Sequence, residues 1–186
     1  MHKIFITPII KKNNYGKLSI INNLDLINYF NKLNFLCTSS YSADKKLLFE
    51  ICKNNDVLIL SGGGNIANIE KTKENKIRDS FEKKLVELFV KKKKPIIAIC
   101  RGFQLLVNIS KYPIGKISKH VRTIHKIKIL KKNNFLNCNN LITNSYHEYG
   151  IKELDKEYEI LGIADDGSIE LAFNKKKKNS MFYVSS

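Results

Sequence analysis

A cysteine, an arginine and a glycine stand together where a short apolar run ends, and this pattern could support chemistry. The run PIIAI (95–99) predicts a buried strand, and RGFQLLVNIS (101–110) predicts a helix that begins directly after Cys100. A thiol on such a sharp turn lies above the sheet, while small neighbours, here Ala98 and Gly102, let strand and helix approach closely. The pattern therefore indicates a nucleophile elbow with Cys100 as the nucleophile.

The surroundings of Cys100 can activate the thiol and stabilise the charge that a reaction creates. At a helix N-terminus the backbone N–H groups and the helix dipole favour a thiolate. The N–H of Arg101 can face the oxyanion of an acyl intermediate, and Gly62 or Gly63 of the loop SGGGN (61–65) can supply a second donor. An inert core cysteine is the alternative for Cys100 taken alone, but the elbow and the glycine loop together favour the nucleophile.

Arginine is rare in this chain. Only three of the 33 basic residues are arginines, namely Arg78, Arg101 and Arg122. Because a planar guanidinium can bind a carboxylate or phosphate with two hydrogen bonds, we expect Arg78 and Arg122 to contact an acidic substrate group, with chance retention of three arginines as the alternative. The segment HVRTIH (120–125) places two histidines beside Arg122 and predicts a pocket for such a group, with an ordinary polar loop as the alternative.

The size and composition fit one globular domain spanning residues 1–186, of which 43% are hydrophobic. No segment approaches the ~20 apolar residues of a membrane span, so we expect no membrane partner. The four cysteines form no CxxC pair, so we expect reduced thiols, no metal site and a cytoplasmic protein.

The positive charge of the chain comes almost entirely from lysine. The formal net charge is +16, and lysines are scattered or gathered in KKKK runs at 91–94 and 175–178. No aromatic residues alternate with basic ones and no known nucleic-acid motif is present. The charge therefore favours a solvated surface, and we expect no nucleic-acid partner.

Strands and helices alternate in the first half of the sequence. We expect strands at 3–10, 35–40, 56–60 and 95–99, and helices at 24–35, 44–54, 77–94 and 101–110. The second half predicts short strands at 125–130, 140–145, 158–165, 168–173 and 180–185. The expected fold is α/β, an open and mostly parallel sheet with helices on both faces, followed by extra C-terminal antiparallel strands. Ligand sites of such sheets lie at the carboxyl ends of the strands.

Five segments resemble one protein family in the same order. PIIAICRGFQLL (95–106) resembles the nucleophile motif of class I glutamine amidotransferase-like proteins, and LILSGGGNI (58–66) resembles their oxyanion loop. Together with the helix RDSFEKKLVELFVKKKK (78–94), the chain is similar to the peptidase C26 branch, which includes gamma-glutamyl hydrolases and gamma-glutamyl-gamma-aminobutyrate hydrolase. TNSYHEYGI (143–151) resembles the Asn-Ser-x-His segment of that branch, and DDGSIELAF (165–173) its Asp-Gly-x-x-Glu segment.

The resemblance implies a flavodoxin-like fold and hydrolysis of a gamma-glutamyl amide without a cofactor. The thiolate of Cys100 would attack the delta-carbonyl and expel an amine or ammonia, and water would then release glutamate from the thioester. It also implies that the small-molecule substrate is contacted by Gln104, Asn144 and Ser145.

One catalytic element of the family is not found in this sequence. The family takes its base from a late His-Pro-Glu that follows a strand, whereas here SMFYV (180–184) is followed by Ser185 and Ser186. We therefore expect that the domain lacks its C-terminal end, as a fragment or as a natural truncation. Alternatively His147 serves as the base, although a structural or substrate-contacting role is the one we favour for it. Glu170 either faces the site or simply ends a strand.

The small size of the chain and its segment 120–125 are similar to gamma-glutamyl-CDP-amidate hydrolases of bacterial capsule phosphoramidate pathways. Such a substrate carries a diphosphate and a carboxylate, which would suit the rare arginines. The alternatives are a glutaminase subunit that supplies ammonia to a synthase, and an inactive binding protein of the same fold. The Asn-Ser-x-His segment argues against a thiol-redox protein. The oligomeric state stays open.

Overall fold

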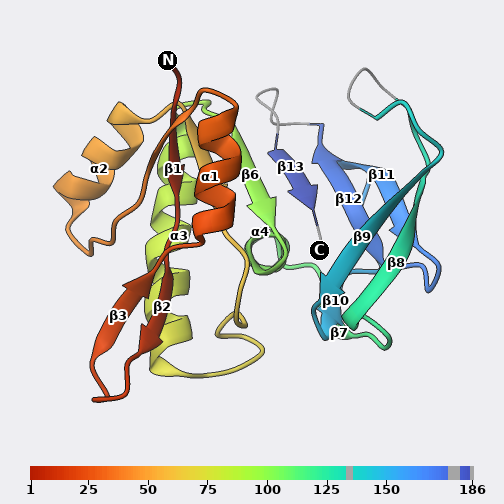
Figure 1. Ribbon diagram of the computed structural model, residues 1–186, viewed down its shortest axis with the longest axis horizontal. Coiled ribbons are helices and arrows are strands. Elements are labelled where there is room, and N and C mark those ends of the chain that lie inside the picture. The colour runs from red at the N-terminus through yellow and green to blue at the C-terminus, as the bar shows by residue number, and fades with distance from the viewer. Residues whose placement is uncertain (133–135, 176–180, 185–186) are drawn as a thin grey trace. The chain divides into compact units, whose positions relative to one another are not determined.

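The computed structural model describes residues 1–132, 136–175 and 181–184 (Figure 1). The packing of the chain divides it into two compact units, Met1–Ile97 and Ala98–Ser186. The expected single domain over 1–186 stays a prediction. The described residues do not include the lysines at 176–178. They also do not include Ser185 and Ser186, on which the expectation of a missing C-terminal end rests.

The first unit contains parallel strands in the order β4-β1-β5, followed in the sheet by β6, which the boundary after Ile97 divides. Its strands are β4 (Leu36–Thr38), β1 (Lys3–Ile6), β5 (Val57–Leu60) and β6 (Ile96–Ile99). Ile4 pairs with Cys37 on one side and with Val57 on the other, so β1 is a central strand. The apolar side chains of β1 and β5 are almost all buried, which explains why these strands read as continuous apolar runs.

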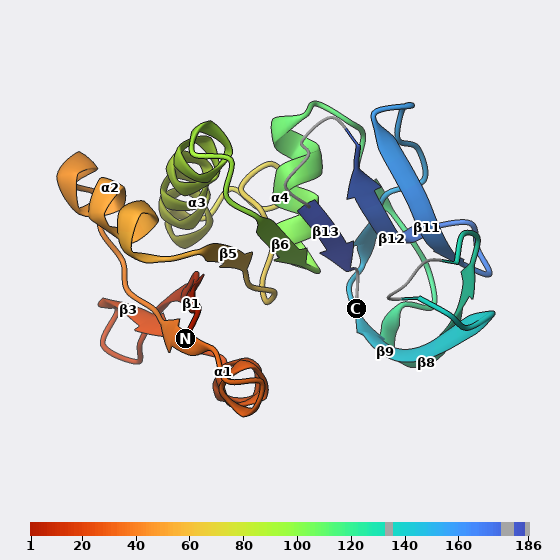
Figure 2. The same cartoon turned by 90° about the horizontal axis from the view of Figure 1, so that it is seen from above.

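Helices cover both faces of this sheet, as expected. They are α1 (Leu24–Lys32), α2 (Lys45–Asn54) and α3 (Lys73–Lys91). Each begins after a residue whose side chain accepts a hydrogen bond from the first turn, namely Asn23, Asp44 and Thr72. Figure 2 shows α1 on one side of the sheet and α2 with α3 on the other. Among the described helices, none has the length and apolar character that crossing a membrane requires.

The expected strand 3–10 is in fact two strands, and a hairpin follows. β1 ends at Ile6, and β2 (Ile9–Lys12) begins after Pro8, which has no N–H to donate to a ladder. β2 pairs antiparallel with β3 (Leu18–Ile21). The side chain of Asn13 accepts hydrogen bonds from the N–H groups of Tyr15 and Lys17, which closes the turn between these strands.

The second unit contains α4 (Arg101–Ile109) and an antiparallel sheet in the order β13-β12-β11-β8-β9. The strands are β8 (Val121–Ile129), β9 (Asn140–Tyr146), β11 (Tyr158–Ala164), β12 (Ile169–Asn174) and β13 (Met181–Val184). A small separate pair joins β7 (Gly115–Lys116) to β10 (Tyr149–Gly150). The antiparallel strands expected in the second half are therefore confirmed, and they hold a core of Ile127, Ile129, Leu161 and Leu171.

Candidate active site

The turn at Cys100 has the backbone of a nucleophile elbow. β6 ends at Ile99, α4 begins at Arg101, and Cys100 between them has φ 50° and ψ −109°. A residue with a Cβ rarely adopts a positive φ, and such backbone strain concentrates at functional sites. The carbonyl of Cys100 accepts the first helical hydrogen bond from the N–H of Gln104, at 3.1 Å. The strand, turn and helix expected around Cys100 are therefore confirmed.

The helix behind the thiol is buried along most of its length. All residues from Arg101 to Val107 are buried, whereas Cys100 itself is partly exposed. All four cysteines of the chain are thiols. A helix N-terminus surrounded by apolar groups exerts a stronger field on a nearby charge than one in water. The predicted role of the Arg101 N–H as an oxyanion donor stays a prediction.

Gln104 lies one helical turn after Cys100 and has one unused acceptor. Its Nε2 donates to the carbonyl of Tyr149 at 2.8 Å. Its Oε1 is buried and has no hydrogen-bond partner within the described part of the chain. Because buried polar atoms are normally satisfied, this oxygen can accept a hydrogen bond from a bound ligand.

His147 follows β9, where side chains alternate between the two faces of the sheet. Ser145 and His147 are buried, whereas Asn144 is exposed. The Nδ1–H of His147 donates to the carbonyl of Tyr149 at 3.1 Å, the same carbonyl that Gln104 binds. The pKa of His147 is lowered to about 4, chiefly by burial. The hydrogen bond to Tyr149 raises this pKa, and two nearby histidines lower it. The imidazole is therefore neutral at pH 7.

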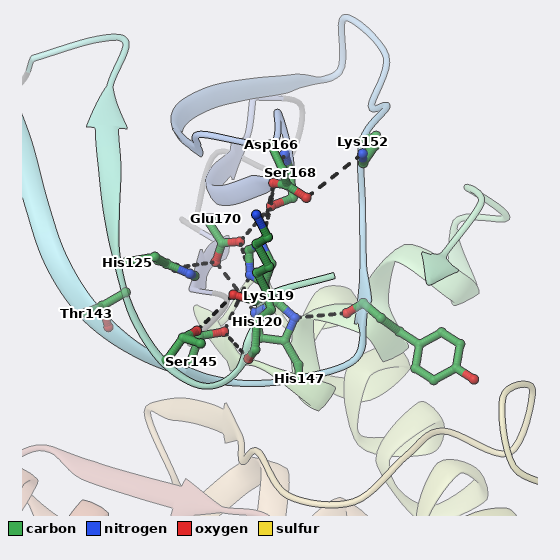
Figure 3. A network of polar contacts seen from close by, with 12 residues as sticks. Lys119, His120, His125, Thr143, Ser145, His147, Lys152, Asp166, Ser168 and Glu170 are labelled. Carbon is green, nitrogen blue, oxygen red and sulfur yellow. Dashed lines mark hydrogen bonds and ion pairs between the residues drawn. The ribbon is translucent and has the colours of Figure 1, made fainter. Parts of the chain in front are cut away.

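Three histidines converge on one buried carboxylate (Figure 3). Glu170 of β12 is 0% exposed, and a ring nitrogen of each histidine faces it. The distances are 3.7 Å from His120 Nδ1 to Oε1, 3.9 Å from His125 Nε2 to Oε2, and 3.8 Å from His147 Nε2 to Oε2. The ring centres of His125 and His147 lie 4.6 and 5.0 Å from that of His120. Sequence analysis grouped His120 and His125 but gave no sign that they meet His147 and Glu170.

Hydroxyl groups and a second carboxylate hold His120 in place. Ser145 Oγ donates to the carbonyl of His120 at 2.6 Å, which ties β9 to the start of β8. His120 Nε2 lies 3.4 Å from Asp166 Oδ1 and 3.5 Å from Ser168 Oγ. Partial burial opposes ionisation of Asp166, but hydrogen bonds from Ser168 outweigh it and bring the pKa of Asp166 below its usual value. Ser145, expected to contact substrate, thus has a clear local role in orienting His120.

In the first unit, Arg78 of α3 binds the carbonyl side of the glycine loop. Its Nη1 donates to Gly63 O at 2.7 Å, and its Nη2 donates to Ser61 O at 2.7 Å and to Gly62 O at 3.1 Å. Its Nε donates to Glu82 Oε1 at 3.0 Å. Arg78 is 2% exposed, so the guanidinium is part of the interior.

The arginine thereby sets the direction of the loop amides. In a trans peptide the C=O and the following N–H point in opposite directions. Because Arg78 binds the carbonyls of Ser61 and Gly62, the N–H groups of Gly62 and Gly63 face away from it. This arrangement favours a positioning role for Arg78 over the predicted contact with substrate. Whether Gly62 or Gly63 donates to an oxyanion stays a prediction.

The segment 120–125 does not act as one cluster. His120 is buried and His125 is partly buried, whereas Arg122 is exposed. Arg122 has a φ of 55° where the register of β8 with β9 shifts between Val121 and Thr123. The arginine at this bulge is therefore exposed while its two histidine neighbours are buried or partly buried, and the predicted contact of Arg122 with substrate stays a prediction.

Comparison with known proteins gives consistent results. The sequence profile of the family Peptidase C26 matches residues 34–185. A gamma-glutamyl-CDP-amidate hydrolase of Campylobacter jejuni is 29% identical over 165 residues, which cover 89% of this chain and 73% of that protein. Protein NtpR of Enterococcus hirae is 29% identical over 62% of this chain and 59% of its own length. A glutamine amidotransferase from Thermotoga maritima has a similar structure, with a TM-score of 0.70, 13% identity, and coverage of 99% of this chain and 74% of that one.

Proposed function

Because the chain belongs to the peptidase C26 family, a family of gamma-glutamyl amide hydrolase and glutamine amidotransferase-like enzymes, we propose that it hydrolyses a gamma-glutamyl amide through Cys100. One observation supports this most directly. Cys100 has φ 50° and ψ −109° at the junction of β6 and α4, a conformation that costs free energy and presents the thiol at a helix N-terminus.

The proposed reaction has two steps. The base takes the proton of the Cys100 thiol, the resulting thiolate attacks the delta-carbonyl carbon, and the Arg101 N–H stabilises the oxyanion that forms. The intermediate collapses with cleavage of the C–N bond, and the leaving amine takes a proton from the protonated base. Water then attacks the thioester, gives a proton to the base, and releases glutamate and the thiol. The reaction requires no cofactor.

We propose His147 as the base within this chain. Its Nδ1 is held by the Tyr149 carbonyl, which also binds Gln104 in the first turns of the helix that Cys100 begins. The shared carbonyl links His147 to that helix. The buried Oε1 of Gln104 is a suitable acceptor for the alpha-ammonium group of a glutamyl substrate.

For the substrate, we propose a gamma-glutamyl amide whose leaving group carries a nucleotide. The hydrolase from Campylobacter jejuni supports this choice by its name, and the net charge of +16 favours an anionic substrate. The chain spans only 59% of the length of NtpR. Any activity that depends on the full length of such a relative is therefore also a proposal for this chain. Because the cysteines are thiols, we also propose that the protein acts in the cytoplasm.

The test is release of glutamate by this chain from glutamine, simple gamma-glutamyl amides and a nucleotide-linked gamma-glutamyl amide. We expect release from at least one amide by the wild type, a loss of more than ~10³-fold in Cys100→Ala, and no loss in the matched variant Cys138→Ala. Full activity of Cys100→Ala would overturn the proposal.

His147→Gln separates the proposed base from a structural histidine. If His147 is the base, its replacement should lower kcat at neutral pH by ~10²-fold or more with little change in KM. If the wild type binds the nucleotide-linked amide tightly but releases no glutamate, an inactive binding protein of the same fold is favoured instead. Release from glutamine alone favours an ammonia-supplying subunit.

A further inference from the structure

The cluster around Glu170 contains donor groups that the proposed reaction does not use. His120, His125 and Glu170 each present one nitrogen or oxygen atom, and these atoms all lie within 4.8 Å of one another. We propose that His120, His125 and Glu170 bind a zinc ion. The sequence offered no zinc motif, because Glu170 lies in β12, far along the chain from His125 of β8 and from His120 directly before β8.

The distances within the cluster are close to those of a zinc site. Zinc lies about 2.0–2.2 Å from nitrogen and oxygen ligands, so tetrahedral ligand atoms are ~3.3–3.6 Å apart. His120 Nδ1 and His125 Nε2 lie 3.7 and 3.9 Å from the oxygens of Glu170. These separations exceed a hydrogen bond and run to different oxygens of Glu170, so an ion bound to all three residues would draw together ligand atoms that lie within 4.8 Å of one another.

His120 has the outer contacts of a metal-binding histidine. Such a residue donates the hydrogen of one ring nitrogen to a carboxylate and binds the metal through the other. The Nε2 of His120 lies 3.4 Å from Asp166 Oδ1, and its Nδ1 faces Glu170. This contact favours the tautomer with the hydrogen on Nε2, which leaves the lone pair of Nδ1 directed at the cluster.

His125 gives an independent reason to expect a ligand. Both of its ring nitrogens are buried, and neither has a hydrogen-bond partner among the described residues. A buried imidazole without hydrogen bonds is costly, and coordination through Nε2 would remove part of that cost.

The charge and chemistry of the set favour a divalent metal of the zinc type. Glu170 is fully buried, and an ion in the interior is stabilised by an opposite charge. Imidazole nitrogens suit zinc, and two histidines with one glutamate form a known class of zinc site. The fourth position would be taken by water, which leaves the Nε2 of His147, 3.8 Å from Glu170 Oε2, to act as the proposed base. The ion would join β8 to β12, which are separated in the sheet by β11.

The experiment measures zinc directly and does not depend on catalysis. The full chain is freed of metal by a chelator and titrated with Zn²⁺ by calorimetry, with Co²⁺ absorption as a report on coordination. We expect one equivalent bound to the wild type, loss of binding in Glu170→Gln and His125→Phe, and a 10- to 100-fold weaker affinity in Asp166→Asn. The exposed His2→Gln should bind like the wild type.

Two further measurements make the result decisive. Cys100→Ala must keep the zinc, because otherwise the thiol is the ligand and the proposal is wrong. Zinc should raise the Tm of the wild type but leave the Tm of Glu170→Gln unchanged, with circular dichroism to verify that the variant folds. Absence of stoichiometric zinc in the wild type, or unchanged binding in folded Glu170→Gln and His125→Phe, would refute the site while leaving the proposed hydrolysis untouched.

Discussion

Two buried polar networks, one in each unit, differ in how closely their polar side chains approach their partners. In the first unit the fork of Arg78 is matched to acceptors at 2.7–3.1 Å, namely three loop carbonyls, Ser61 Oγ and Glu82. In the second unit the imidazole nitrogens lie 3.7–3.9 Å from the carboxylate they face. The first network is closed by its own hydrogen bonds, whereas the second has room for an added atom.

The difference follows from the chemistry of the side chains. A guanidinium has five donors in a fixed plane and is always charged, so it orders whatever carbonyls surround it. An imidazole offers one donor and one acceptor when neutral, and it can leave a lone pair available for a metal. A buried arginine thus indicates a framework, and a buried group of histidines indicates a binding site.

The largest expected effect is on the framework network. Arg78→Met removes the bonds to the glycine loop and leaves Glu82 without its buried ion pair, so we expect a loss of about 3–5 kcal/mol in the free energy of unfolding. Urea denaturation measures this loss. The exposed Lys91→Met on the same helix should change stability by less than ~0.5 kcal/mol. A loss below 1 kcal/mol for Arg78→Met would show that the closed network is not a framework.

The glycine loop gives a smaller effect with a matched pair of variants. Gly63 has φ 86°, and an added Cβ would lie 2.9 Å from Ile9 Cδ1. Gly64 has φ 74°, but nothing lies within 4 Å of its added Cβ. We expect Gly63→Ala to cost about 2–3 kcal/mol and Gly64→Ala about 1 kcal/mol in urea denaturation. Equal costs would mean that Ile9 yields and only the backbone is strained.

Acidity should act on the histidine network. The pKa of His147 is lowered from 6.5 to about 4, so between these pH values the unfolded chain binds a proton that the folded chain does not. The free energy of unfolding of the metal-free protein should therefore fall as the pH drops from 6.5 to 4, by on the order of 1–2 kcal/mol from this group. Denaturation of His147→Leu across the same range should show a shallower slope. An identical slope would contradict the assignment.

The smallest expected change in stability comes from replacing His125, and unlike Arg78→Met it need not be a loss. Replacing His125 with Leu in the metal-free protein removes two buried nitrogens that lack hydrogen bonds, so we expect a change below ~1 kcal/mol, or a gain in stability. Thermal unfolding with and without chelator measures it. A loss above ~2 kcal/mol would show that the imidazole is satisfied in the folded protein and that the two networks are alike.

The sequence predicted best those elements whose causes are local. The apolar run 95–99, the cysteine and the small neighbours Ala98 and Gly102 were sufficient for the elbow, which the backbone of Cys100 confirms. The helices α1, α2 and α3 were expected to within four residues of their observed ends. The hairpin of β2 and β3 was missed, although Pro8 and the turn at Asn13 signalled it.

The parts that sequence could not predict depend on contacts between distant residues. The scarcity of arginine marked Arg78 as special but could not tell a loop support from a substrate contact. The histidine cluster brings together His120 and His125 of one segment with His147 and Glu170 of two others, and no spacing rule connects the three segments. Register was decisive, because it buries Ser145 and His147 of one segment while it exposes their neighbour Asn144.

The strained backbone at Cys100 means that selection for stability and selection for activity favour different residues at position 100. Glycine adopts a φ of 50° without steric cost, so it would relax the turn by ~1–3 kcal/mol, whereas alanine or serine would keep the strain. A library randomised at position 100 and sorted for folding alone should accumulate glycine. The same library sorted for turnover should return cysteine, so the most active sequence and the most durable sequence of this domain would differ at this position.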